Sequence, residues 1–346
     1  MEKYIRDLAN NKNRNNINGF FSIKNIKIFY KILNDSDYEK ELIGYNILKD
    51  YYRVPLRYFE ISKNNTNIVG YEYNENIQKN KGLLVDYFSN HEVLNSKYQD
   101  LLKIYYDVFK NTIKFGKKGN CRMFFEDRLN TRLKDNMSNK HIKNYNKQVV
   151  NFNGITTEFA NNLIYNNILK YFKTKRKTWN VISNADPNDM NICIDGTLFD
   201  YTAGGYVPIM CEFAVFVYYN LVQGEYLSLK YNQTSFKEHK KIYKKINKVK
   251  QLNGQLKHKP RDIRINAIYK YIEIVVKPIL EKIEYDDWYN DFKNYFAMKV
   301  VAVYNFSEMK QKDILLSMCY LNLFYNKNFK KIEELKMFIK KIYREV

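Results

Sequence analysis

The stretch "SNADPNDMNICIDGTLFDY", residues 183–201, decides the fold of this chain. Asp186 precedes a polar loop, Asn191 follows five positions later, and Asp200 ends a hydrophobic stretch. Two short apolar runs, "NICI" and "TLFDY", are separated by Asp195-Gly196, a dipeptide that favours a tight hairpin turn. Such a hairpin returns Asp200 to the end from which Asn191 departs and leaves Asp195 at the opposite tip. We therefore expect Asp186, Asn191 and Asp200 to meet.

These three side chains are of the types that phosphoryl transfer requires. A carboxylate must orient the attacking hydroxyl, and hard oxygen atoms must bind magnesium. Asp186 is the candidate catalytic residue, and Asn191 and Asp200 are candidate ligands of one metal ion. Asp186 is also the only Asp of the chain with an Asn five positions later. The alternative is a polar loop whose Asp and Asn side chains cap turns through local backbone hydrogen bonds.

The hydrophobic pattern changes along the chain. Runs such as "IKIFYKIL" and "NIVGYEYNE" are typical of half-buried strands, and from Leu94 onward apolar residues recur at helical spacing. The pattern predicts an α+β fold with a small strand-rich N-terminal lobe and hinge over residues 1–90. A larger, mostly helical C-terminal lobe is expected over residues 91–346, with the loop and hairpin at 183–205.

Composition excludes several classes of protein. With 346 residues, 45% of them hydrophobic, the chain is not of the disordered type. The longest apolar stretch, "VPIMCEFAVFVYYNLV", is too short for a bilayer span and contains Glu212. The N-terminus does not have the pattern of a signal peptide, so we expect a cytoplasmic protein. The four cysteines lie far apart in sequence without C-x-x-C spacing, which indicates reduced thiols.

The net charge of +21 has two interpretations. It could attract a polyanion, or it could follow from a composition rich in Lys, Asn, Ile and Tyr. Residues 236–265 are the most basic part and either bind RNA or an anionic surface or form a solvated helix with Ile242, Tyr243, Ile246 and Val249 packed. The segment "IEYDDWYNDF", 283–292, is either a site for a cationic amine or an acidic helix start with core aromatics.

The segment "NADPNDMNICIDGTLFDYTAGG", 184–205, resembles the catalytic loop and metal-binding hairpin of the aminoglycoside phosphotransferase and choline kinase-like families. These families share the protein-kinase-like fold. Their motif is His-Gly-Asp, four residues, Asn, and then a strand that ends in Asp. Asp186, Asn191 and Asp200 match it, whereas Asn184 and Ala185 replace the His-Gly pair and the hairpin is shorter. The resemblance implies a two-lobed kinase that uses Mg²⁺ and ATP or GTP.

The N-terminal region extends this resemblance. "IKIFYKIL" is similar to the strand whose lysine holds the nucleotide phosphates, which indicates Lys31. The following helix would supply the glutamate that pairs with this lysine, with Glu41 as first choice and Glu39 as second. The resemblance further implies a phosphate-covering loop at "NNINGFFSIK", which contains Gly19. It also implies a hinge against the adenine at "LLVDYFSN", which contains Asp86. Glu212 either braces the catalytic loop or lies near its helix N-terminus because of the helix dipole.

Three hypotheses about function follow. The first is a kinase that moves the γ-phosphoryl group of ATP or GTP to a hydroxyl of a small molecule, such as an aminoglycoside, choline or a sugar. The second is a catalytically impaired pseudokinase or scaffold, because the His-Gly pair is absent and glycines are sparse. The third is a protein that binds RNA or an anionic surface through residues 236–265, which would lose affinity steeply with salt.

Overall fold

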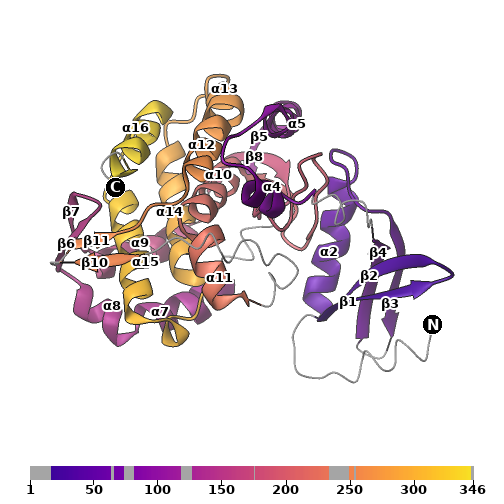
Figure 1. Cartoon of the computed structure of the whole chain (residues 1–346), viewed down its shortest axis with the longest axis horizontal. Coiled ribbons are helices and arrows are strands. Elements are labelled where there is room, and N and C mark those ends of the chain that lie inside the picture. Colours follow the sequence, from indigo (N-terminus) through magenta and orange to yellow (C-terminus); the bar gives the residue numbers. More distant parts are fainter. Residues whose placement is uncertain are drawn as a thin grey trace.

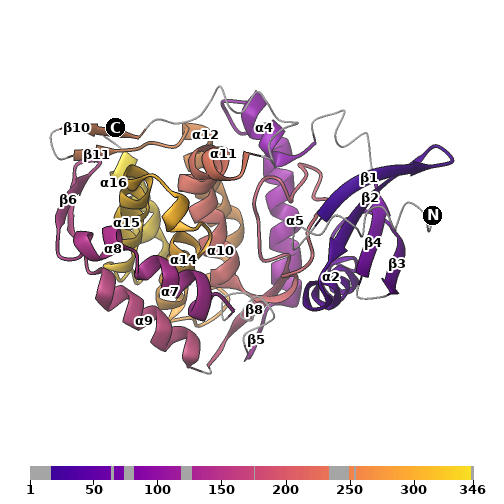
Figure 2. The ribbon, with the colours of Figure 1, turned by 90° about the horizontal axis from the view of Figure 1, so that it is seen from below.

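A computed structural model describes residues 17–63, 66–73, 82–117, 127–174, 176–233, 249–252 and 255–343. An N-terminal sheet with one helix lies at one side, and the helices of the later chain form the larger part at the other (Figure 1). Helices α4 (Leu84–Asn90) and α5 (Ser96–Thr112) lie between the two in both views (Figures 1 and 2).

The N-terminal sheet is antiparallel in the order β1-β2-β4-β3. Its strands are β1 (Ile17–Ile23), β2 (Ile26–Leu33), β3 (Arg57–Lys63) and β4 (Thr66–Glu72). Lys24 and Asn25, both with positive φ, form the two-residue turn between β1 and β2. Helix α2 (Asp35–Leu48) begins where Asn34 accepts a hydrogen bond from the Asp37 amide, and it buries Glu41, Gly44, Tyr45 and Leu48.

The strand-rich region ends earlier than the sequence predicts. "LLVDYFSN" forms the short helix α4 instead of continuing the strand pattern. The reason is packing: Leu84, Val85, Tyr87 and Phe88 are all buried, and consecutive buried positions do not distinguish a strand from a buried helical turn.

The larger part is built from helices that surround α10 and α14. The main helices are α5, α9 (Asn161–Lys173), α10 (Ile209–Tyr218), α12 (Asp262–Tyr271), α14 (Trp288–Ala302), α15 (Gln311–Tyr325) and α16 (Ile332–Tyr343). Shorter helices are α7 (Lys134–Met137), α8 (Lys140–Tyr145), α11 (Ser228–Tyr231) and α13 (Lys277–Leu280). The helical path from α10 continues as a π-helical segment, Tyr219–Leu227.

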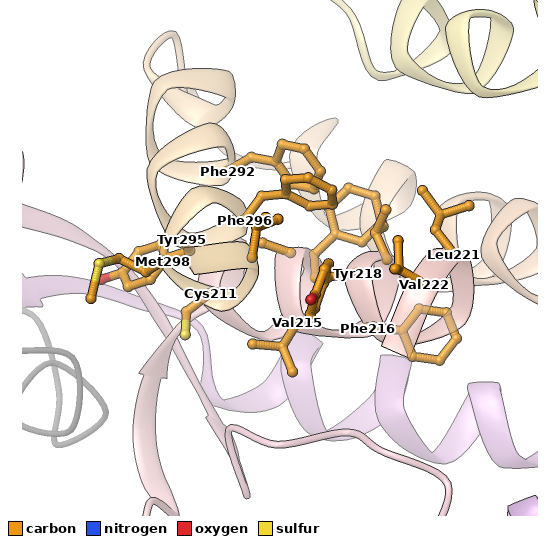
Figure 3. Close-up of a cluster of buried hydrophobic side chains, with 14 of the residues drawn as sticks. Cys211, Val215, Phe216, Tyr218, Leu221, Val222, Phe292, Tyr295, Phe296 and Met298 are labelled. Carbon is orange, nitrogen blue, oxygen red and sulfur yellow. The ribbon is translucent and has the colours of Figure 1, made fainter. Parts of the chain in front are cut away.

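Figure 3 shows the core between α10 and α14, where the rings of Tyr218 and Phe296 meet edge to face with their centroids 5.8 Å apart. Phe292 and Phe296 stack with their ring centroids 5.7 Å apart, and every residue of α10 is buried. A helix whose residues are all buried, and all apolar except Glu212, must lie inside the protein, and it gives the adjoining loop that contains Asp186 a rigid support.

Two further sheets lie among the helices, and the sequence did not predict them. The first has the order β5-β8-β9, with β5 (Lys114–Lys117), β8 (Lys177–Ser183) and β9 (Gly205–Pro208). The second has the order β10-β11-β6-β7, with β6 (Val149–Phe152), β7 (Ile155–Glu158), β10 (Lys250–Leu252) and β11 (Gln255–Lys257). Most of these strands are only three or four residues long, and the seven-residue β8 buries four consecutive positions, so neither kind shows a clear alternation.

The predicted α+β class is confirmed: an antiparallel N-terminal sheet is followed by a mostly helical region. The stretch 184–204, which contains Asp186, Asn191 and Asp200, runs from the end of β8 to the start of β9, so one small sheet holds both of its ends. None of the helices in the described ranges has both the length and the apolar composition needed to cross a bilayer.

Candidate active site

Lys31 joins the N-terminal sheet to the hairpin. Its Nζ lies 2.8 Å from Glu41 Oε1 and 3.0 Å from Asp200 Oδ1. Burial alone would lower the pKa of Lys31, but the carboxylates of Asp200 and Glu41 outweigh this effect and raise it. Lys31 in turn lowers the pKa of Asp200, whose side chain is half exposed. Strand, helix and hairpin therefore meet at one charged cluster.

Glu41 is the most constrained member of this cluster. It is fully buried, and besides Lys31 it accepts hydrogen bonds from Tyr71 Oη (2.9 Å), Thr202 Oγ1 (2.9 Å) and the Tyr201 amide (3.2 Å). One turn later, Gly44 lies so close to the hairpin that an added Cβ would be 1.9 Å from the Tyr201 carbonyl oxygen. Glycine is therefore required for α2 to approach the hairpin closely.

Asp186 and Asn191 are in contact at the start of the loop. Asn191 Nδ2 lies 3.3 Å from the Asp186 carbonyl oxygen and 3.5 Å from its Oδ2, and Asn188 Nδ2 donates to the same Oδ2 at 2.8 Å. Two side-chain amides of the same loop therefore hold the Asp186 carboxylate.

The expected hairpin is present in a minimal form. Ile192 and Leu198 form an isolated bridge, and the Phe199 amide donates to the Asn191 carbonyl at 2.8 Å. The turn falls at Asp195 and Gly196, where Gly196 has φ +86° and Asp195 pairs with exposed Arg53. Asp200 thus follows directly on the residue that lies beside Asn191, whereas Asp195 is remote from the metal candidates.

The loop that contains Asp186 has Asn184 and Ala185 where the resembling families have His-Gly, and other contacts hold it. Asn184 is fully buried and its Nδ2 lies 3.5 Å from the Phe199 carbonyl oxygen, which ties the loop to the end of the hairpin. Ala185 has φ +61°, a left-handed conformation that favours glycine. Its amide donates to Ser183 Oγ at 3.1 Å, and Ser183 Oγ in turn donates to Glu212 Oε2 at 2.5 Å. Glu212, on α10, therefore braces the loop through Ser183.

Glu212 is expected to make stability depend on pH. Burial raises its pKa from 4.5 to about 8, and its Oε1 has no hydrogen-bond partner in the described part. Because the folded state holds this proton more tightly than the unfolded chain, ionisation destabilises the fold progressively from pH 4.5 to pH 8 and adds nothing further above. Glu212→Gln should remove this loss. Its melting temperature relative to wild type should rise between pH 5 and pH 8 and then stay level; a constant difference would contradict the assignment.

The residues at the hairpin end fit a magnesium ion. Asp200 offers a half-exposed carboxylate, and Asn191 directs its Nδ2 to Asp186 while its Oδ1 accepts no hydrogen bond from a described residue. Both are hard oxygen donors of the kind that Mg²⁺ prefers. Within the described ranges, no group of three or more His, Cys, Asp or Glu side chains could hold a metal ion. A two-residue site is consistent with an ion whose other ligands are phosphate oxygens and water.

Two predicted cofactor residues lie elsewhere in the fold. Gly19 is inside strand β1 instead of a loop. An added Cβ there would meet the Tyr30 ring at 2.3–2.8 Å, so the glycine leaves room for this ring. Asp86 lies in the first turn of α4. The backbone of this segment does not match the expected hinge: the Leu84 and Val85 amides donate to the carbonyl oxygens of Ile192 and Asp189. Both roles stay predictions, and residues 74–81, which precede α4, lie outside the described ranges.

The basic stretch 236–265 is only partly described, and Ile242, Tyr243 and Ile246 lie outside the described residues. Val249 is buried. Arg264 is fully buried, where it pairs with Asp189 of the catalytic loop and, at 3.0 Å, with Glu225, while Arg261 also binds Glu225. These two arginines form ion pairs inside the protein and are not available to an external polyanion.

In the acidic segment 283–292, Asp291 and Trp288 support the structural interpretation. Asp291 is fully buried and accepts from Arg176, Thr178 and Tyr285, and Trp288 is buried at the start of α14. The Asp291 carboxylate therefore already has a cationic partner inside the protein.

Sequence reasoning missed Lys299. Its Nζ lies 3.0 Å from Asp186 Oδ1, although the two residues are 113 positions apart. The available signal was a single lysine inside the apolar run "FAMKVVAVY", since a buried lysine requires a partner.

Comparison with solved structures identifies the fold of the chain. A crystal structure of aminoglycoside phosphotransferase APH(4)-Ia aligns over 94% of this chain and 97% of its own, with a TM-score of 0.53 and 8% identity. A thermostable mutant of APH(4)-Ia in its apo form gives a TM-score of 0.51 at 7% identity, over 94% of this chain and 98% of its own. The chain has the aminoglycoside phosphotransferase fold.

Other structures with this phosphotransferase fold align less closely. Spectinomycin phosphotransferase APH(9)-Ia, in complex with ADP and spectinomycin, covers 95% of this chain and 91% of its own at 10% identity and a TM-score of 0.44. In sequence, no protein-family model and no curated protein matches the chain. The likeness therefore lies in the phosphotransferase fold, while the roles of individual residues depend on the geometry above.

Proposed function

We propose that the chain is a small-molecule kinase that transfers the γ-phosphoryl group of ATP or GTP to a hydroxyl. One observation carries the proposal: Lys31 binds both Glu41 and Asp200, at the end of the hairpin where Asn191 contacts Asp186. A cation, two oxygen donors for a metal and an orienting carboxylate are the parts that phosphoryl transfer needs. The likeness to APH(4)-Ia over nearly the whole chain supports this combination.

Each residue has a separate task in this proposal. Lys31, fixed by Glu41, binds the nucleotide phosphates, and Asp186 accepts a hydrogen bond from the acceptor hydroxyl. Asn191 and Asp200 hold magnesium, which when bound neutralises charge on the phosphate oxygens. The Glu212–Ser183–Ala185 contacts keep the loop in position. An aminoglycoside, choline or a sugar-like molecule each offers a suitable hydroxyl.

Nucleotide binding is tested by thermal melting with ATP and GTP, with and without magnesium. We expect a magnesium-dependent rise for the wild type, equivalent to about 2.7 kcal/mol at ~100 times the dissociation constant. Asp200→Asn should lose the magnesium-dependent part, while Asp195→Asn, at the hairpin tip, should retain it. A melting temperature that responds to neither nucleotide would reject the proposal.

A catalytically impaired scaffold is the second candidate. It is favoured by Asn184, whose buried Oδ1 has no hydrogen-bond partner among the described residues where the family has a histidine. A panel of hydroxyl acceptors distinguishes the two functions: both bind nucleotide, but only the kinase converts it to ADP with a phosphorylated product.

A further inference from the structure

Lys299 is a charged residue in the apolar core of α14. Only 7% of its side chain is exposed, and its neighbours Phe296 and Met298 lie in the hydrophobic cluster shown in Figure 3. In the described part of the chain, Asp186 is the only carboxylate within 4.0 Å of its Nζ. The buried Lys299 thus places its ammonium group beside the Asp186 carboxylate, which is proposed to orient the acceptor hydroxyl.

Stability alone does not account for this lysine. A buried ion pair is a weak source of folding free energy, and an apolar side chain of similar volume would pack among the same neighbours equally well. What the ammonium does provide is a fixed, charge-assisted hydrogen bond to Oδ1. Asn188 holds Oδ2 from the opposite side at 2.8 Å, so the carboxylate cannot rotate freely.

We propose that Lys299 is a positioning residue for phosphoryl transfer, an inference that rests on the function proposed above. In the reaction, the acceptor oxygen forms a bond to the γ-phosphorus as the bond to the β,γ-bridging oxygen breaks. The electron pair of that bond stays on the departing nucleoside diphosphate, and the hydroxyl proton passes to the Asp186 carboxylate. Lys299 fixes Oδ1 throughout, which keeps the carboxylate aligned with the attacking hydroxyl.

The test compares Lys299→Met and Lys299→Arg with Lys293→Met as a matched control on the same helix, using MgATP and an accepted hydroxyl substrate. Lys299→Met should lower kcat about 10- to 100-fold with KM for ATP within about twofold of wild type, because alignment and not nucleotide binding is lost. Lys299→Arg, which keeps the charge and a donor, should restore most of kcat, and Lys293→Met should behave as wild type.

The decisive readout is a double-mutant cycle with Asp186→Asn. If Lys299 acts through Asp186, then Lys299→Met should change the residual rate of Asp186→Asn less than about twofold. It should also raise the melting temperature of Asp186→Asn, because it removes a lysine left without its counter-charge.

Several outcomes would overturn the inference. These are a wild-type kcat in Lys299→Met, an equal fold-loss in both backgrounds, or no recovery in Lys299→Arg. If Lys299→Met does not fold, Lys299→Gln, which keeps a hydrogen bond without the charge, takes its place under the same criteria. A wild-type protein that fails to turn over any acceptor would instead overturn the proposed function, and the inference with it.

Discussion

Asp186→Asn should reduce kcat by about 10²–10⁴-fold while the protein stays folded, with a melting temperature lowered because Lys299 loses its counter-charge. The amide can still accept from Asn188, but it cannot take the proton of an acceptor hydroxyl. The loop should remain in place because Asn191 also bonds to the Asp186 backbone carbonyl and the Ser183–Glu212 contact is untouched. The measurement is steady-state nucleoside diphosphate production with an accepted hydroxyl substrate.

The control for this variant is Asp195→Asn, in the same stretch but at the hairpin tip. Asp195 pairs with Arg53, whose side chain is 74% exposed, so turnover should remain within about twofold of wild type. Unchanged turnover in Asp186→Asn would remove Asp186 from the chemistry, while equal losses in both variants would indicate a general loss of loop structure.

Arg264→Met should lower the free energy of unfolding by about 3–5 kcal/mol. Arg264 is fully buried and binds Asp189, Glu225 and Asn220, so its removal leaves the Asp189 carboxylate buried beside Tyr219 without a cation. Because the Asp189 carbonyl oxygen also accepts from the Val85 amide, the damage should spread to the contact between the catalytic loop and α4. Urea unfolding monitored by circular dichroism measures the effect.

Arg53→Met provides the matched comparison, since Arg53 also pairs with an Asp of this stretch but is exposed to solvent. An exposed pair of this kind contributes about 0–1 kcal/mol. Equal destabilisation by the two substitutions would show that burial of Arg264 is not what makes its ion pairs important.

The core of the candidate site could be predicted from the sequence because its spacing is local. The Asp-Gly turn determines that the chain reverses between Asn191 and Asp200, and the resemblance to the kinase-like families indicated Lys31 and Glu41. The structure pairs Lys31 with Glu41 and not with Glu39. Glu41 faces the hairpin, where the Tyr201 amide and the Thr202 hydroxyl donate hydrogen bonds to its carboxylate.

The remaining features depend on contacts between distant segments, which one sequence does not reveal. Lys299 reaches Asp186 only because α14 packs on α10, next to the end of the catalytic loop. The α4 backbone bonds to the catalytic loop because the buried residues of "LLVDYF" fit a helical turn there. Local pattern also could not distinguish internal arginines such as Arg264 from the exposed charges of a basic surface.

The absence of a side chain at Gly44 has a consequence for how the protein works. With α2 seated directly on the Tyr201 carbonyl, Glu41 lies within reach of Lys31, and the Lys31–Glu41 pair is already formed without a nucleotide. A nucleotide would therefore bind to a lysine and a glutamate that are already ordered. The entropy cost of ordering these side chains would lower the stability of the fold and not the affinity for the nucleotide.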